Sequence, residues 1–231
     1  MFNNVLFINL KERTDRLQHV QHELQKIGIH NAVRVNAIKR DVGAIGCSLS
    51  HIAALEMAKE RKWDQVFICE DDITFLKPEV LRENVEKFAY SGLEWDVVII
   101  GGNNSPPFQI VNDCCCRIKN CQTTTGYIIR NHYYDVLIQN FRETVVNLTR
   151  EPTNGRKYAI DIHWKILQKT GNWYMIIPPT VIQYENYSDI EKKMRNYNYL
   201  MLDMEKKWLY EVGVPVLNAR GELINWSPIK K

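Results

Sequence analysis

The sequence of 231 residues lacks a long hydrophobic run, a low-complexity tract and a strong excess of either charge. Because no apolar run approaches about 20 residues, we expect no transmembrane helix. The apolar stretch of residues 5–10 is too short for a signal-peptide core, so we expect the protein in the cytoplasm or peripheral to a membrane, or, if it is viral, in the host cell or virion. Thirty basic against 27 acidic side chains give a net charge of +3, which does not indicate a nucleic-acid-binding protein.

Two phosphate-binding motifs are also missing. The chain has neither a Gly-x-x-x-x-Gly-Lys-Ser/Thr loop nor a Gly-x-Gly-x-x-Gly fingerprint, which argues against kinase-like and Rossmann-cofactor functions. The six cysteines are Cys47, Cys69, Cys114, Cys115, Cys116 and Cys121. The last four lack the paired spacing of a zinc site, and we expect reduced thiols or one local disulfide. We expect the first two to be small buried side chains.

Strand and helix patterns alternate along the chain. We expect strands near residues 5–10, 32–37, 65–69, 95–100, 125–130 and 173–177, and helices near residues 17–27, 48–57, 78–88, 131–141 and 159–170. Residues 103–120 and 149–157 are predicted to be loops, and Ser188 is predicted to begin a long charged helix. This alternation predicts an α/β fold in one domain, with a mostly parallel central sheet flanked by helices.

Three consecutive acids, Glu70, Asp71 and Asp72, end the apolar strand at residues 65–69. They would repel one another unless a positive group lies among them. Because side chains alternate along a strand, Glu70 and Asp72 can point to one side and Asp71 to the other. Two carboxylates on one side suit a hard divalent cation, which in turn can hold a diphosphate. The alternative is a solvated turn before the next helix, which the distance to Pro78 disfavours.

Seven segments extend this observation along the chain. They are residues 9–16 (NLKERTDR), 43–51 (GAIGCSLSH), 67–72 (FICEDD), 96–101 (DVVIIG), 125–130 (TGYIIR), 179–183 (PTVIQ) and 188–190 (SDI). Together, in this order, they resemble glycosyltransferase family 25, the group of lipooligosaccharide and collagen hydroxylysine galactosyltransferases. The resemblance implies a GT-A type fold, a UDP-sugar donor and a divalent metal, usually Mn2+. It also implies transfer of galactose or glucose with inversion to a glycan or a collagen-type hydroxylysine.

The resemblance assigns the metal to the acidic triplet, with Glu70 and Asp72 as ligands at the two ends of an Asp-x-Asp type motif and Asp71 in the middle. His163 is the candidate that would complete the metal sphere. For the base that takes the proton from the acceptor hydroxyl, Asp161 is the first choice and Asp189 the second. An acid that stabilises a helix N-terminus is the alternative for Asp161.

Donor binding has candidates in two places besides the triplet. Arginine can grip phosphate with two hydrogen bonds, and a nucleotide can lie at the end of the first strand, although an exposed Arg–Asp pair is the alternative there. A helix N-terminus is expected at Ser50 and His51, where a capping serine and a hydrogen-bonded histidine are the alternative. The donor-site candidates are Asn9, Leu10, Arg13, Arg16, Ser50, His51 and Asp71.

Within the single catalytic domain, we assign residues 1–125 to the nucleotide-sugar and metal half, 126–190 to the acceptor side and 191–231 to a C-terminal helical extension. An aromatic, amphipathic helix from Tyr197 to Trp208 is expected to pack on the core, with a homodimer or membrane-surface contact as the alternative. Clustered acids with a cation also serve a metal-dependent phosphohydrolase, and the same fold can form a catalytically silent sugar- or nucleotide-binding module.

Overall fold

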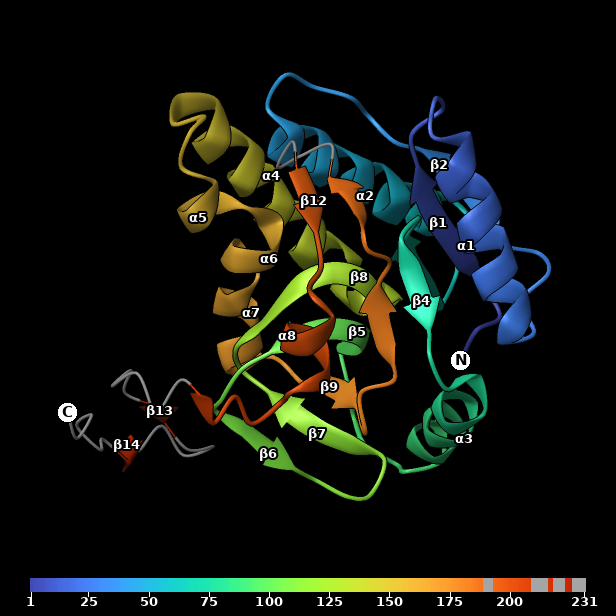
Figure 1. The fold of residues 1–231 in the computed structure, drawn as a ribbon, viewed down its shortest axis with the longest axis vertical. Coiled ribbons are helices and arrows are strands. Elements are labelled where there is room, and N and C mark those ends of the chain that lie inside the picture. Colours follow the sequence, from blue (N-terminus) through green and yellow to red (C-terminus); the bar gives the residue numbers. More distant parts are fainter. Residues whose placement is uncertain (189–192, 209–215, 218–222, 226–231) are drawn as a thin grey trace.

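A computed structural model describes residues 1–188, 193–208, 216–217 and 223–225. Its main element is an eight-stranded sheet with the order β2-β1-β3-β8-β5-β9-β7-β6 (Figure 1). The strands are β1 (Val5–Asn9), β2 (Val33–Asn36), β3 (Gln65–Glu70), β5 (Val97–Asn104), β6 (Phe108–Ile110), β7 (Cys115–Ile118), β8 (Cys121–Arg130) and β9 (Trp173–Ile176). Strands β7 and β8 run antiparallel to their neighbours, and the other six share one direction. The predicted α/β fold class is therefore confirmed.

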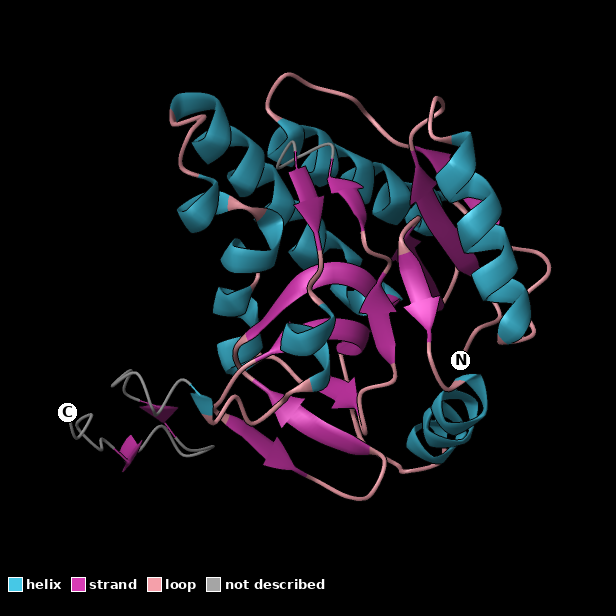
Figure 2. Cartoon of the chain, viewed as in Figure 1, coloured by secondary structure: helices cyan, strands magenta, loops and turns pink. Residues whose placement is uncertain are grey.

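Helices cover both faces of this sheet (Figure 2). They are α1 (Thr14–Lys26), α2 (Gly43–Glu60), α3 (Pro78–Ala89), α4 (Tyr134–Arg150), α5 (Gly155–Tyr158), α6 (Ile160–His163) and α7 (Lys165–Thr170), with a 3-10 turn η1 (Asn131–Tyr133) before α4. Along β1, Leu6 and Ile8 pack in the core with α2 and α4, whereas Val5 and Phe7 pack in the core with α1 and α3. None of the described helices combines the length and apolar character needed to cross a bilayer.

Helix α2 begins at Gly43, earlier than predicted, so Ser50 and His51 lie in the middle of the helix and not at its N-terminus. The helix start packs closely against the segment that follows β2. A Cβ on Gly46 would lie 2.3 Å from the carbonyl oxygen of Ile38, a distance that only glycine allows. The Ser50 hydroxyl donates to the carbonyl of Gly46 (2.7 Å) and accepts the N–H of Ile38 (2.8 Å). Ser50 therefore joins α2 to this segment.

The loop predicted over residues 103–120 is wrong, because this segment contains β6 and β7 at the edge of the sheet. Cys115 packs into one core and Cys116 into the other, as expected for successive residues of a strand. Buried cysteine behaves as a small hydrophobic side chain, so this run is an apolar strand. All six cysteines of the chain are free thiols, which excludes the predicted alternative of a local disulfide in this structure.

In the described part of the chain, three two-stranded antiparallel sheets lie outside the large sheet. They pair β4 (Ile73–Phe75) with β10 (Val181–Gln183), β11 (Asn186–Ser188) with β12 (Lys193–Arg195), and β13 (Val216–Leu217) with β14 (Leu223–Asn225). The long helix predicted from Ser188 is wrong, because residues 193–195 pair with β11 and satisfy their backbone groups in a ladder. Asp189 lies outside the described residues.

The amphipathic helix predicted from Tyr197 to Trp208 is reduced to α8 (Asn198–Leu202). This stretch still packs on the core, because Met201 is buried and the ammonium of Lys206 donates to the carbonyl of Asn104 at the end of β5. Core packing, the default expectation for this segment, is what the described residues show.

Candidate active site

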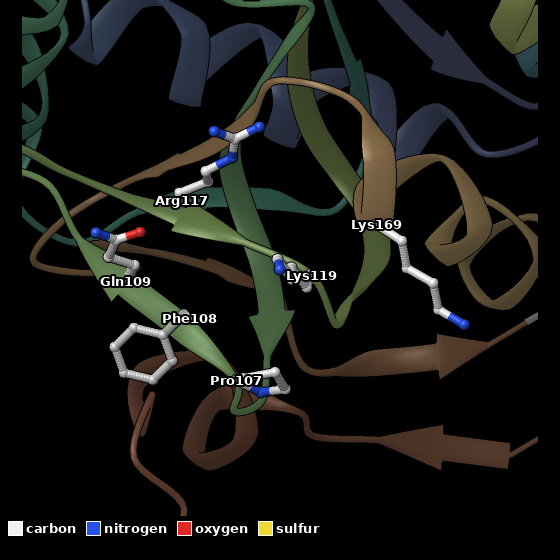
Figure 3. A pocket seen from close by; sticks show the side chains of 6 residues that line it. All are labelled: Pro107, Phe108, Gln109, Arg117, Lys119 and Lys169. Atoms are coloured by element: carbon white, nitrogen blue, oxygen red, sulfur yellow. The ribbon is translucent and has the colours of Figure 1, made fainter. Parts of the chain in front are cut away.

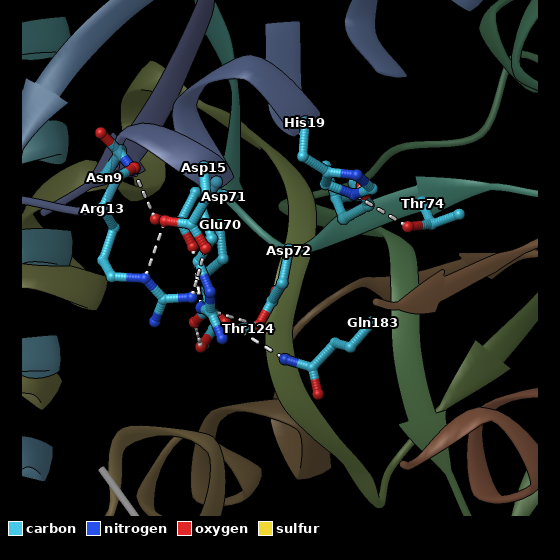
Figure 4. Close-up of polar contacts among 12 residues, drawn as sticks. Asn9, Arg13, Asp15, His19, Glu70, Asp71, Asp72, Thr74, Thr124 and Gln183 are labelled. Atoms are coloured by element: carbon cyan, nitrogen blue, oxygen red, sulfur yellow. Dashed lines mark hydrogen bonds and ion pairs between the residues drawn. The ribbon is translucent and has the colours of Figure 1, made fainter. Parts of the chain in front are cut away.

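The acidic triplet lies where β1, β3 and β8 come together (Figure 4). The parallel ladder of β1 with β3 places Asn9 beside Asp71. The antiparallel ladder of β3 with β8 ends at Cys69 and Gly126, and Thr124, two residues before Gly126, hydrogen-bonds Glu70. The cluster therefore forms at the carboxyl end of a central strand, where ligands of α/β sheets bind.

Glu70 accepts hydrogen bonds from three different elements. Its Oε1 lies 2.5 Å from Thr124 Oγ1 on β8 and 3.3 Å from His51 Nε2 on α2. Its Oε2 lies 3.3 Å from Gln183 Nε2 on β10. Burial opposes ionisation of this carboxyl, but the hydrogen bond and charge of His51 together with Thr124 hold its pKa below the ordinary value.

The positive group that the sequence required among the acids is Arg16. Its Nη1 lies 3.0 Å from Asp71 Oδ1 and 3.4 Å from Asp72 Oδ2. Asn9 Nδ2 donates to Asp71 Oδ2 at 2.7 Å. Burial is the main cause that raises the pKa of Asp71.

Asp72 is the least satisfied acid of the cluster. Its Oδ1 is buried and has no hydrogen-bond partner among the described residues. Burial first, and the charge of Glu70 second, raise the pKa of Asp72 to about 8. A single guanidinium therefore does not neutralise the triplet, and the free carboxylate oxygen leaves a position for a cation.

Arg13 is held differently from Arg16. Its Nε and Nη2 donate to the two carboxylate oxygens of Asp15 at 3.0 Å and 2.8 Å, and the charge-assisted pair lowers the pKa of Asp15 to about 2. The N–H of Arg13 also donates to the carbonyl of Leu10 at 3.0 Å, which closes the turn after β1. Both predicted phosphate-binding arginines thus contact acids, and a phosphate would have to compete with these carboxylates.

Asp161 at the start of α6 belongs to the same electrostatic environment. Its Oδ2 accepts the N–H of Thr123 at 3.1 Å, and burial together with the charge of Glu70 raises its pKa. Thr123 has a φ of 64°, a strained value for a β-branched residue and a feature typical of functional sites. His163 Nε2 lies 3.2 Å from Glu143 Oε2 on α4, so its observed contact does not support the predicted role as a metal ligand.

His51 connects the triplet with helix α2. Its Nδ1 lies 3.0 Å from the hydroxyl of Tyr127 and its Nε2 faces Glu70. One ligand atom each from Cys47, His51 and Glu70 lie within 4.8 Å of one another. The sequence reasoning missed Cys47 as a site residue, although its four-residue spacing from His51 places both on one helix face.

Thr124 and Gln183 were also missed as site residues. Nothing in the local sequence indicates that β8 and β10 reach Glu70, because these contacts depend on the strand order. The hydroxyl of Ser50 is engaged within α2 and with the segment after β2, so its predicted contact with the donor has no support from this geometry.

Two surface hollows lie away from the acids. The first has a volume of about 270 Å³ and is named here the basic hollow; its lining residues are Pro107, Phe108, Gln109, Arg117, Lys119 and Lys169 (Figure 3). The second has a volume of about 640 Å³ and is lined by Pro179, Tyr199, Leu202, Asp203, Met204, Glu205, Lys207 and Trp208. Neither is lined by the triplet, and the candidate active site is recognised by its buried charges.

An acidic cluster at the carboxyl end of a central strand in a mixed α/β sheet is typical of proteins that bind a cation and a phosphorylated ligand. Residues 41–98, which include α2, β3 and the triplet, match the family model described as Glycosyltransferase family 25 (LPS biosynthesis protein). The resemblance predicted from the sequence motifs is thus confirmed over this segment. No curated protein matches the sequence closely enough to indicate a relative.

Among solved structures, the chain is similar to a glycosyltransferase involved in the glycosylation of the major capsid of PBCV-1, with a TM-score of 0.49 and 9% identity over 74% of this chain and 80% of that chain. It is also similar to a UDP-glucose pyrophosphorylase complexed with UDP-glucose, with a TM-score of 0.47 and 10% identity over 76% and 90%. A Drosophila galactosyltransferase in complex with manganese, UDP-Gal and xylobiose has a TM-score of 0.38 and 12% identity over 89% and 76%.

Proposed function

We propose that the protein is a metal-dependent glycosyltransferase that moves a sugar from a UDP-sugar to a hydroxyl group with inversion. The observation that carries this proposal is the cluster of buried acids inside the segment that matches glycosyltransferase family 25. Galactose or glucose is the proposed sugar, and a glycan or a collagen-type hydroxylysine is the proposed acceptor.

Glu70 and Asp72 are the residues that would hold the cation. They fit this role because Asp72 Oδ1 is buried without a partner among the described residues, and because repulsion from Glu70 contributes to raising the pKa of Asp72. When bound, Mn2+ would neutralise the negative charge that develops on the departing diphosphate. Asp71, fixed by Asn9 and Arg16, would keep the strand end in place.

Asp161 is the proposed base. Burial raises its pKa, which favours a carboxylate able to accept a proton near neutral pH. The acceptor oxygen would attack the anomeric carbon while the bond from that carbon to the diphosphate oxygen breaks. The hydroxyl proton would pass to Asp161 and the electron pair of the broken bond would leave with UDP. Asp189 stays the second choice for this base.

The donor phosphates are proposed to lie at the end of β1, next to Leu10 and the arginines. Binding there requires Arg13 to give up part of its contact with Asp15, which is exposed and can exchange that contact for water. Arg16 would keep its position between the acids and the diphosphate. His51 would act in this site by holding Glu70.

A panel of nucleotide sugars tests the proposal. The protein is incubated with each donor and Mn2+, and then with a chelator, and the released UDP is measured. Release of UDP from one nucleotide sugar that stops when the metal is removed supports the proposal. If no nucleotide sugar is turned over, the proposal fails. Phosphate release from simple esters without a sugar acceptor would instead indicate a phosphohydrolase, and donor binding without turnover a silent binding module.

A further inference from the structure

Three chemically different side chains meet at the inner end of the acidic cluster. Cys47 and His51 lie one turn apart on the same face of α2, and Glu70 approaches them from the end of β3. Their ligand atoms lie within 4.8 Å of one another, and His51 Nε2 is 3.3 Å from Glu70 Oε1. Of the six cysteines of the chain, Cys47 is the one that is partly exposed, whereas the other five are buried.

The surrounding residues hold this group in an orientation suited to a ligand. The Tyr127 hydroxyl lies 3.0 Å from His51 Nδ1, and the two rings stack at 5.7 Å, so that Nε2 is directed at Glu70. Thr124 fixes Glu70 through its Oε1 at 2.5 Å. A histidine oriented through its second ring nitrogen and a hydrogen-bonded carboxylate are the usual surroundings of metal ligands in proteins.

The donor set favours one kind of cation. Thiolate, imidazole and carboxylate together suit Zn2+, whereas magnesium and manganese prefer oxygen ligands. Bonds of about 2.0 to 2.3 Å to zinc place tetrahedral ligands about 3 to 4 Å apart, which this group reaches with small shifts of its side chains. The pKa of Glu70 is held below its ordinary value, so this carboxylate supplies negative charge beside the thiol, which also favours a cation at this place.

We propose that Cys47, His51 and Glu70 form a binding site for a thiophilic divalent cation, Zn2+, with the fourth position open. Because the site uses Glu70, zinc would withdraw a ligand from the manganese position and inhibit sugar transfer. Zinc binding itself does not depend on the proposed function, but this inhibition rests on it.

Cobalt provides a direct probe of the site, because Co2+ occupies zinc sites and absorbs in the near ultraviolet when a thiolate binds it. The metal-free protein is titrated with Co2+ and its absorption recorded. We expect one equivalent to produce the thiolate band, and Zn2+, but not an equal amount of Mn2+, to abolish it. Cys47→Ala is expected to lose the band, because alanine fits the helix but offers no ligand.

Cys69→Ala is the matched control, since Cys69 precedes Glu70 on β3 but packs in the opposite core. It is expected to keep the band. The proposal is overturned if the wild-type protein gives no thiolate band, or if the band survives in Cys47→Ala. If the panel of nucleotide sugars gives turnover, Cys47→Ala should need at least ~10-fold more zinc for half inhibition. If no nucleotide sugar is turned over and the cobalt band depends on Cys47, the proposed function fails and the zinc site stands.

Discussion

The acidic cluster and the basic hollow carry comparable numbers of charged side chains, but the charges are buried in the first and mostly exposed in the second. In the acidic cluster, burial and mutual repulsion raise the pKa of Asp72 to about 8, and one of its oxygens has no partner among the described residues. In the basic hollow, Lys119 and Lys169 are exposed. Arg117 there donates to two neutral acceptors, the carbonyl of Gly171 at 3.2 Å and Asn172 Oδ1 at 3.0 Å.

This difference teaches that the density of charge along a sequence does not identify a site. Burial of charged groups without enough hydrogen-bond donors or counter-charges does. Exposed ammonium groups keep their water and interact weakly with one another. Carboxylates removed from water need a proton, a hydrogen-bond donor or a cation. The acidic cluster therefore requires a ligand to carry its full charge at neutral pH, whereas the basic hollow does not.

The largest expected effect comes from removing one buried acid. We predict that Asp72→Ala lowers metal-dependent turnover about 1000-fold, equivalent to about 4 kcal/mol, because the cation loses a ligand. Thermal unfolding of this variant should occur no earlier than in the wild type, since a repelled carboxyl has been removed. Lys119→Ala in the basic hollow is the control and should keep activity within about twofold. Unchanged turnover in Asp72→Ala would remove the triplet from the mechanism.

Arg16 in the acidic cluster and Arg117 in the basic hollow should differ in how much each contributes to the free energy of unfolding. Arg16→Ala removes the cation that contacts the buried acids Asp71 and Asp72 and should lower the free energy of unfolding by about 3 kcal/mol. Arg117→Ala leaves neutral acceptors that water can serve and should cost about 1 kcal/mol. Urea unfolding at neutral pH measures both values. Equal losses would show that the buried acids do not depend on Arg16.

A conservative substitution of Asp161 distinguishes a role in proton transfer from a role in hydrogen bonding. Asp161→Asn keeps an oxygen for the N–H of Thr123 but cannot take a proton, so kcat should fall about 100-fold while donor binding persists. Asp96→Asn is the matched control, because Asp96 Oδ2 likewise accepts a backbone N–H, from Asn172 at 2.8 Å, at the opposite end of the sheet. Steady-state kinetics with varied donor distinguish the two variants. Similar losses in both would indicate a structural effect.

Features that depend on neighbouring residues could be predicted from the sequence. The apolar run of β3 that ends in Glu70 placed the triplet at the carboxyl end of a strand. The mutual repulsion of the acids required a positive group among them. That group could not be identified as Arg16 alone, since Arg13 and Arg16 both follow β1. The choice between them depends on the direction in which α1 leaves the strand.

Features that depend on strand order could not be predicted. Tyr127 and Thr124 reach His51 and Glu70 because β8 runs antiparallel between β3 and β5. The helix expected after Ser188 is wrong for a different reason: the capping-box pattern favours a helix there, but residues 193–195 pair in an antiparallel ladder with the neighbouring strand Asn186–Ser188. Of the residues missed from the site, Thr124 and Gln183 are therefore the ones that the pairing of distant strands brings to Glu70.

The smallest effect, and the one that tests the burial argument itself, is the pH dependence of manganese binding. Because the pKa of Asp72 is raised to about 8, the cation has to displace a proton below that pH. Affinity for Mn2+ should rise up to ~10-fold per pH unit from about pH 6 and level off above about pH 8. Without metal, the raised pKa means that the folded protein binds this proton more tightly than the unfolded chain does. The contribution of Asp72 to the free energy of unfolding therefore falls as pH rises from about 4 through about 8. Calorimetric titration and thermal unfolding with and without Mn2+ measure both trends, and an affinity independent of pH over this range would show that Asp72 is already ionised, as an exposed acid would be.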